Sequence, residues 1–189
     1  MCIETIVLAS YNLNKAEEIQ MLLGNQFHVI PQQMFDIPPI EETGSTFQEN
    51  ALLKAKTVFE ITGLPVIGDD SGLEVAALDN QPGIYSARFA GNNATDDDNI
   101  EKLLRKMHKI PLANRTARFR CVVAILGAKS IDQPVFFQGE WIGYIAEERT
   151  GKNGFGYDPI FVDLKSNRTA AELNSGQKNK ISHRGKAIQ

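Results

Sequence analysis

A short apolar run leads directly into a polar segment and then into a helical pattern at the start of this chain. Residues 3–9 are nearly all apolar, which suits a buried strand. Residues 14–23 repeat apolar side chains at helical spacing, and Gly24 follows them. The polar residues 10–15 are therefore predicted to join a buried strand to the start of a helix.

The rest of the chain mixes strand and helix patterns. Helices are predicted over residues 46–62, where Thr46 begins a capping-box pattern, and over 96–107, whose first turn is acidic. The other predicted segments are strands at 27–30, 65–68, 73–77, 115–126 and 160–162, strand segments at 135–146 broken by Gly139 and Gly143, loops at 31–44 and 151–156, a turn at Pro82 and Gly83, and a helix from 175 to the end. Hairpins and crossovers together favour an α/β or α+β sheet with helices on its faces.

Length and charge exclude several classes of protein. A chain of 189 residues allows one domain or two small lobes. No apolar run approaches the roughly 20 residues that span a bilayer, and the first residues do not resemble a signal peptide. A net charge of −3 argues against a dedicated nucleic-acid binder. The two cysteines, Cys2 and Cys121, form no disulfide framework, so a cytoplasmic location is predicted, with Cys121 as a buried thiol.

Two polar clusters indicate phosphate and metal chemistry. The helix start at residues 10–15 could hold a polyphosphate through its N–H groups and Lys15, although Asn12 or Asn14 could equally be an ordinary helix cap. An acidic cluster combines Glu41 and Glu42 of the predicted loop with Asp69 and Asp70 at the end of a strand, where carboxylates suit Mg²⁺. The alternative for these acids is a simple turn.

Two further clusters indicate recognition of a flat ligand. Phe155 lies among glycines at residues 154–159, where its ring could stack on a base; alternatively, Phe155 and Tyr157 are core residues. Residues 178–185 of the last predicted helix carry basic side chains that could donate to a keto oxygen. A solvated basic helix end explains the same residues.

Taken in order, these clusters resemble the inosine triphosphate pyrophosphatase family, whose members hydrolyse ITP, dITP and XTP. The matching segments are residues 10–15, 41–51, 69–75, 82–88, 154–161 and 182–187. Each segment alone is weak or moderate evidence, whereas six in sequence are specific. They extend over almost the whole chain.

The resemblance implies a fold and an assembly. It implies an α/β fold with a long, curved mixed sheet flanked by helices, two lobes within one domain over residues 1–189, a substrate cleft between the lobes, and a homodimer. Two departures carry expectations of their own. Tyr11 stands where the family usually has glycine, which predicts crowding or a positive φ. The last helix extends only five residues past Arg184, which predicts weaker packing around His183 and Arg184.

The resemblance also implies the reaction and the roles of individual residues. A purine nucleoside triphosphate and water would give the monophosphate and pyrophosphate, with Asp70 as the catalytic proton acceptor. Mg²⁺ would bind Glu41 and Asp70, with Glu42 and Asp69 as nearby candidates. The implied substrate-binding residues are Ser10, Tyr11, Asn12, Leu13, Asn14, Lys15, Ser71, Phe155, Gly156, Tyr157, Asp158, Lys178, His183 and Arg184.

Within this set, the family pattern divides the residues between phosphates and base. Ser10, Asn12 and Lys15 would hold the phosphates, and Phe155 would stack on the base. His183 and Arg184 are hydrogen-bond donors, so they suit the 6-keto group of hypoxanthine and xanthine and leave the 6-amino group of adenine poorly paired.

Two alternatives stay open at this point. A house-cleaning enzyme of the septum-inhibitor type, acting on modified pyrimidine nucleotides, would share the architecture, but the segments at 154–158 and 182–184 speak against it. A non-catalytic nucleotide sensor would lack the acidic residues Glu41, Asp69 and Asp70, which are all present.

Overall fold

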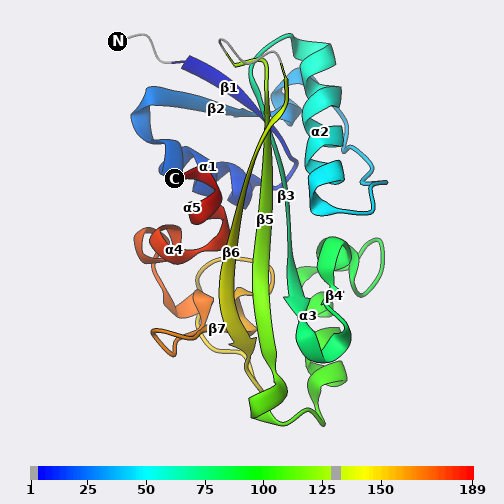
Figure 1. Ribbon diagram of the computed structural model, residues 1–189, viewed down its shortest axis with the longest axis vertical. Coiled ribbons are helices and arrows are strands. Elements are labelled where there is room, and N and C mark those ends of the chain that lie inside the picture. The colour runs from blue at the N-terminus through cyan, green and yellow to red at the C-terminus, as the bar shows by residue number, and fades with distance from the viewer. Residues whose placement is uncertain (1–3, 129–132) are drawn as a thin grey trace. The chain divides into compact units, whose positions relative to one another are not determined.

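The computed structural model describes residues 4–128 and 133–189, whose strands form a seven-stranded mixed sheet (Figure 1). The strands lie in the order β2-β1-β3-β5-β6-β7, and β4 pairs with β3. β1 is parallel to β2 and β3, whereas β3–β4 and β6–β7 are antiparallel. The strands are β1 (Glu4–Ala9), β2 (Phe27–Pro31), β3 (Val66–Val75), β4 (Gln81–Pro82), β5 (Thr116–Leu126), β6 (Val135–Ile145) and β7 (Phe161–Asp163). The α-helices are α1 (Leu13–Leu23), α2 (Phe47–Thr62), α3 (Asp96–Met107), α4 (Ser175–Ile181) and α5 (His183–Ile188).

Contacts within the chain separate it into two compact units. Unit 1 comprises Met1–Asp70, Cys121–Gly139 and Arg184–Gln189, and unit 2 comprises Ser71–Arg120 and Glu140–His183. The strands β3, β5 and β6 each contribute residues to both units. The α/β class with a mixed sheet and flanking helices is confirmed.

Unit 1 has helices on both faces of its part of the sheet (Figure 1). Side chains alternate between the faces of a strand. On one face, alternate strand residues pack with α1 and α5 in a core that contains Ile6, Leu8, Ile19, Ile67, Cys121, Val123 and Ala187. On the other face lies α2, so close that a Cβ on Gly68 would come within 2.1 Å of the Ala51 carbonyl oxygen. Glycine at position 68 therefore permits this helix to approach the sheet.

Unit 2 has its own core around the aromatic residues of the sheet. Phe119, Trp141 and Phe161 come from β5, β6 and β7, and their ring centroids lie 4.6–6.3 Å apart. The buried face of α3 packs into the same core through Ile100, Leu103 and Met107. The acidic first turn predicted for this helix is confirmed, and Thr95 caps it in a full capping box.

The structure corrects three boundaries predicted from the sequence. The two strands predicted at 65–68 and 73–77 are one continuous strand, β3, so the acidic pair lies inside a strand. The parallel pairing of β1 with β3 ends at the Ala9–Gly68 partners, just before Asp69. Likewise β6 is unbroken; a Cβ on Gly143 would lie 2.2 Å from the Val162 carbonyl oxygen, so this glycine permits close approach of β7.

The last predicted helix is two helices in the structure. Ser182 is extended, with φ −69° and ψ 161°, and it separates α4 from α5. Lys178 and Arg184 therefore lie on different helices instead of along one helix. The predicted weak packing of the C-terminal residues is also wrong for the side chains concerned, because His183 and Arg184 are 5% and 1% exposed.

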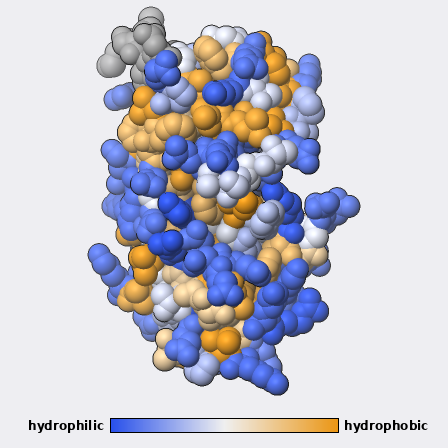
Figure 2. Space-filling model, turned by 45° about the vertical axis from the view of Figure 1, so that its right-hand side comes forward, coloured by the Kyte–Doolittle hydropathy of each residue, from blue (hydrophilic) through white to orange (hydrophobic). Residues whose placement is uncertain are grey.

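The surface is mixed in character. Figure 2 shows charged and apolar residues interspersed on the displayed face. None of the helices within residues 4–128 and 133–189 combines the length and the apolar character needed to cross a membrane.

Candidate functional site

The predicted phosphate loop joins β1 to α1 and is ordered by its own polar side chains. Asn12 is the N-cap of α1, and its Oδ1 accepts a hydrogen bond from the Lys15 backbone N at 3.2 Å. The Ser10 hydroxyl oxygen accepts one from the Asn12 backbone N at 3.1 Å. The cap interpretation is thus confirmed for Asn12. The same geometry leaves the positive end of the α1 dipole at this loop, where an anion is favoured.

Tyr11 fits the loop without the strain predicted from the sequence. It is not among the residues with positive φ, and its side chain is 44% exposed. Its carbonyl oxygen accepts a hydrogen bond from Gln33 Nε2 at 2.9 Å. The neighbouring Leu13 and Asn14 are also exposed. The expected positive φ at Tyr11 is therefore wrong.

The side chains of the adjacent acids Asp69 and Asp70 lie on opposite faces of β3. Consecutive strand residues point in opposite directions. Asp69 contacts α1 and α5 through Lys15 and Arg184, whereas Asp70 contacts α2 through Lys54. The two carboxylates thus lie in different environments, although they are neighbours in the sequence.

Asp70 lies in a buried polar cluster. Its Oδ1 accepts a hydrogen bond from Lys54 Nζ at 2.9 Å, and its Oδ2 accepts one from Asn50 Nδ2 at 3.3 Å. Lys54 Nζ also donates to Glu42 Oε1 at 2.6 Å. Burial raises the pKa of Asp70 to about 6; the charge of Lys54 opposes this shift and that of Glu42 adds to it. A carboxyl group with a pKa closer to neutrality is a stronger base than an ordinary aspartate, which suits proton transfer.

This raised pKa predicts how the metal-free protein responds to pH. The folded chain holds the Asp70 proton more tightly than the unfolded chain, where the ordinary value is 3.8. The free energy of unfolding therefore falls as the pH rises from about 4 to about 7, relative to that of Asp70→Asn, by up to about 3 kcal/mol. Urea denaturation of both proteins in a chelating buffer measures the difference. A difference that stays constant across this range would contradict the raised pKa.

Asp69 is held by cations on the other face of the strand. It is fully buried, and it accepts hydrogen bonds from Lys15 Nζ and from Arg184 Nε, the latter at 3.0 Å. The thiol of Cys121 donates to its Oδ2 at 3.1 Å. Burial alone would raise the pKa of Asp69, but the charges of Arg184 and Lys15 hold this pKa well below its ordinary value. Burial raises the pKa of the Cys121 thiol, so the predicted buried thiol is confirmed.

The carboxylates at Asp70 and Glu42 have the chemistry that suits a magnesium ion. Within the described part of the chain, no group of three or more His, Cys, Asp or Glu side chains is placed to hold a metal ion. Mg²⁺ commonly takes only one or two carboxylates and completes its shell with water and phosphate oxygens. Asp70 and Glu42 share Lys54, whereas Glu41 is exposed. The carboxylate oxygens at Asp70 are therefore suitable ligands for Mg²⁺.

In unit 2, Asp158 organises the predicted base-binding loop. Its Oδ2 accepts hydrogen bonds from the Phe155 backbone N at 3.0 Å and from Lys178 Nζ at 2.5 Å. The Lys178 ammonium lies 4.7 Å from the centroid of the Phe155 ring. Gly154 has φ +75°, and a Cβ there would lie 2.0 Å from Asp158 Oδ2. The turn that carries Phe155 is therefore held in one conformation.

The same loop is attached to the rest of unit 2. The Gly156 backbone N donates to Asp96 Oδ2 at 2.7 Å, and the Tyr157 hydroxyl donates to the Ser86 carbonyl oxygen at 2.8 Å. Tyr157 is 4% exposed and belongs to the core, so the core interpretation holds for Tyr157. Phe155 is only half-buried.

The ring of His183 lies against the aromatic core of unit 2. It stacks on Phe119, with ring centroids 4.7 Å apart and an interplanar angle of 13°. The guanidinium of Arg184 belongs to unit 1, where it binds Asp69 and Glu18. The break at Ser182 thus directs these consecutive residues to different units.

The comparison with known protein families agrees with the resemblance seen in the sequence. The model of the Ham1 family matches residues 6–189. The chain belongs to the Ham1 family. A relative from Coxiella burnetii, described as a dITP/XTP pyrophosphatase, is 50% identical over 185 residues, which are 97% of this chain and 92% of that protein.

Solved Ham1 structures have a similar fold. A HAM1 protein from Coxiella burnetii aligns with a TM-score of 0.86 at 49% identity, covering 98% of this chain and 94% of that one. The Ham1 protein of Staphylococcus aureus aligns with a TM-score of 0.84 at 45% identity, with the same coverage.

Two site residues of this Ham1 chain escaped the sequence analysis. Lys54 and Asn50 belong to the buried face of α2, together with Ala51 and Ala55. The sequence does contain a signal for them, because the buried stripe of this helix is otherwise apolar. A lysine and an asparagine four residues apart on such a stripe indicate a polar site. A buried lysine requires a carboxylate partner, and Asp70 supplies one.

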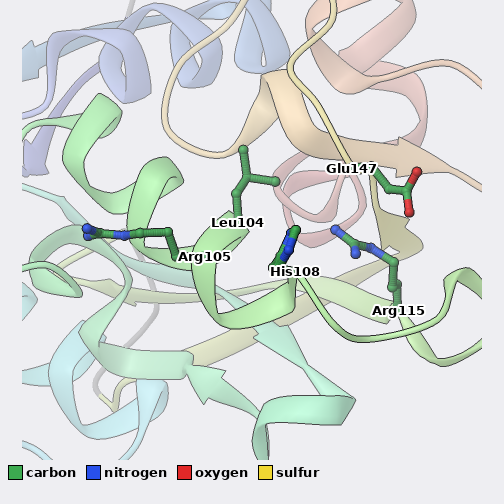
Figure 3. Close-up of a pocket in the computed structure, with 5 residues that line it drawn as sticks. All are labelled: Leu104, Arg105, His108, Arg115 and Glu147. Carbon is green, nitrogen blue, oxygen red and sulfur yellow. The ribbon is translucent and has the colours of Figure 1, made fainter.

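A separate pocket of about 580 Å³ lies in unit 2 (Figure 3). Its lining residues are Leu104, Arg105, His108, Arg115 and Glu147. Arg115 is buried and donates to the carbonyl oxygens of Met107, Ile110, Ile145 and Ala146. The guanidinium of Arg115 thus supports the end of α3. None of the predicted site residues lines this pocket.

Proposed function

We propose that this Ham1 chain hydrolyses dITP, ITP and XTP to the nucleoside monophosphate and pyrophosphate, and so removes non-standard purine nucleotides. The observation that carries the proposal is the buried Asp70 carboxylate, held by Lys54 and Asn50 and adjacent along β3 to Asp69. The relative that is 50% identical supports it, because that protein is described as a dITP/XTP pyrophosphatase.

Asp70 is the proposed proton acceptor for the attacking water. Its carboxylate is oriented from both sides, by Lys54 at Oδ1 and by Asn50 at Oδ2. A fixed orientation avoids reorganisation during proton transfer. Lys54 places a positive charge beside Asp70 and Glu42, which reduces the repulsion between these acids and an incoming triphosphate.

Mg²⁺ is the proposed cofactor. Asp70 would hold it together with an acid of the preceding loop, either Glu41 as the family pattern implies or Glu42, which shares Lys54 with Asp70. When bound, the ion supplies positive charge to the phosphate oxygens.

The phosphates are assigned to the loop that begins α1. The first N–H groups of α1 are the proposed anion donors, together with Ser10, Asn12 and Lys15. Ser71, which follows Asp70 on β3, and the backbone of Tyr11, Leu13 and Asn14 complete the predicted phosphate contacts. A triphosphate would thereby meet positive charge along its length.

Binding of the purine base is assigned to the residues around the Phe155 loop of unit 2. Phe155 would stack on the base, and Gly156 and Tyr157 would supply its backbone surroundings. Asp158 and Lys178 hold each other beside Phe155, so their polar atoms are already oriented. His183 and Arg184 remain the proposed donors to the 6-keto group.

Assembly and location belong to the same proposal. A homodimer and a cytoplasmic location are expected from the family pattern and the free thiol Cys121. Sedimentation of the purified chain tests the dimer.

The experiment that tests the function is pyrophosphate release from ITP, XTP, GTP and ATP, each with Mg²⁺ and with a chelator. We expect metal-dependent release from ITP and XTP, with kcat/KM at least about 10²-fold lower for ATP, because ATP lacks the 6-keto acceptor. A modified pyrimidine triphosphate is included. Preference for that substrate would favour the alternative enzyme, and release from none of them would refute the proposal.

A further inference from the structure

Asp69 is the acid of the β3 pair that the proposed reaction does not use. It is 0% exposed and lies on the strand face opposite to Asp70. Its Oδ1 accepts hydrogen bonds from Lys15 Nζ and Arg184 Nη2, the latter at 3.3 Å, and its Oδ2 accepts from Arg184 Nε at 3.0 Å and Cys121 Sγ at 3.1 Å. Several bonds from two cations hold the carboxylate in one orientation.

Three ion pairs attach the first turns of α1 to this carboxylate. Lys15 binds Asp69 directly. Glu18, three residues later on the same side of the helix, binds Arg184 Nη1, and Arg184 in turn binds Asp69. The start of α1 is therefore attached to β3 at two points that converge on Asp69.

The same attachment extends to the predicted phosphate loop. The Lys15 backbone N donates to Asn12 Oδ1, and the Asn12 backbone N donates to the Ser10 hydroxyl oxygen. A chain of contacts thus runs from Ser10 to Asp69. Because Asp70 is the next residue of the strand, the loop is placed relative to the proposed proton acceptor.

We propose that Asp69 is a positioning residue, which binds Lys15 and, through Arg184, Glu18, and so holds the phosphate loop at a fixed place relative to Asp70. The inference rests on the proposed function. It assigns to Asp69 the alignment of the polyphosphate with the proton acceptor.

The test compares Asp69→Asn with the wild type in two measurements. The first is KM and kcat for ITP. The second is calorimetric binding of inorganic pyrophosphate in metal-free buffer. The amide keeps the shape of the side chain but loses the charge that holds Lys15. We expect KM for ITP and the Kd for pyrophosphate to rise at least about tenfold, because a displaced loop loses several phosphate contacts together.

Asp163→Asn is the matched control. Asp163 is another buried aspartate with several hydrogen-bond donors, including Trp141 Nε1 at 2.8 Å, and it belongs to unit 2. Its substitution is expected to lower stability without changing KM or the pyrophosphate Kd. An Asp69→Asn protein that is less stable but keeps both constants would overturn the inference, since Asp69 would then be only structural.

Two further variants keep the inference testable. In a Lys15→Met background, Asp69→Asn is expected to raise KM by only about threefold, because the contact with Lys15 is already lost and only the attachment through Arg184 and Glu18 remains to be broken. A further rise of about tenfold or more would overturn the inference. If Asp69→Asn does not fold, Glu18→Gln decides, with an expected rise of about threefold in KM and in the pyrophosphate Kd. Unchanged constants for Glu18→Gln would count against the inference.

These measurements distinguish a failure of this inference from a failure of the proposed function. A wild type that hydrolyses none of the triphosphates refutes the function, whereas the pyrophosphate Kd still tests the role of Asp69. A wild type that hydrolyses ITP, together with an unaffected Asp69→Asn protein, refutes only the inference.

Discussion

Asp70→Asn is expected to lower kcat for ITP by about 10²–10⁴-fold, the range that general-base catalysis usually contributes. The amide has nearly the same size as the carboxylate but does not accept a proton from water. Lys54 keeps Glu42 as a partner, so the variant is expected to fold. The stability of the variant relative to the wild type should rise as the pH rises from about 4 to about 7, because only the wild type has a carboxyl group at position 70 that ionises there at a cost.

Pyrophosphate release under saturating ITP measures this change. Asp36→Asn is the control, because Asp36 is exposed and has φ +56°, a conformation that asparagine also tolerates. The control is expected to retain the wild-type rate. A rate close to that of the wild type for Asp70→Asn would remove Asp70 from the mechanism.

Arg184→Ala is expected to cost about 3–5 kcal/mol of unfolding free energy, which is typical of breaking a buried ion pair. The side chain is 1% exposed, and its guanidinium binds the carboxylates of Asp69 and Glu18. Truncation leaves Asp69 and Glu18 without their common cation. Arg184→Lys should recover part of the loss, because a lysine keeps the charge but not the forked geometry.

Urea denaturation compares Arg184→Ala with Arg149→Ala. Arg149 pairs with Asp97 and Glu101 at the surface, so its loss should cost no more than about 1 kcal/mol. Equal losses for the two variants would contradict the buried role. The ITP/ATP ratio of kcat/KM is measured on the same proteins, and an unchanged ratio for Arg184→Ala would exclude Arg184 from base recognition.

Most elements of this fold could be predicted because their signals are local. The buried strand at the start, the acidic helix over Asp96–Met107 and the cap at Thr46 depend on neighbouring residues alone. The Glu49 side chain shows the limit of such motifs: it bonds the backbone N of Ser45 instead of closing a capping box on Thr46.

The errors arose where distant segments decide the structure. Gly143 suggests a break in β6, but the close approach of Val162 explains that glycine. The extended Ser182 interrupts an otherwise helical sequence. Lys54 belongs to the candidate site only because Asp70 and Glu42 lie beside it in space. Periodicity along one segment carries none of this information.

The alternating faces of β3 restrict how this protein can change in evolution. A single-residue insertion or deletion before Asp69, with the rest of the strand kept in register, would exchange the directions of Asp69 and Asp70. The carboxylate that now faces Lys54 would then turn toward Arg184 and Cys121. Length variation by one residue should therefore be excluded from this part of β3.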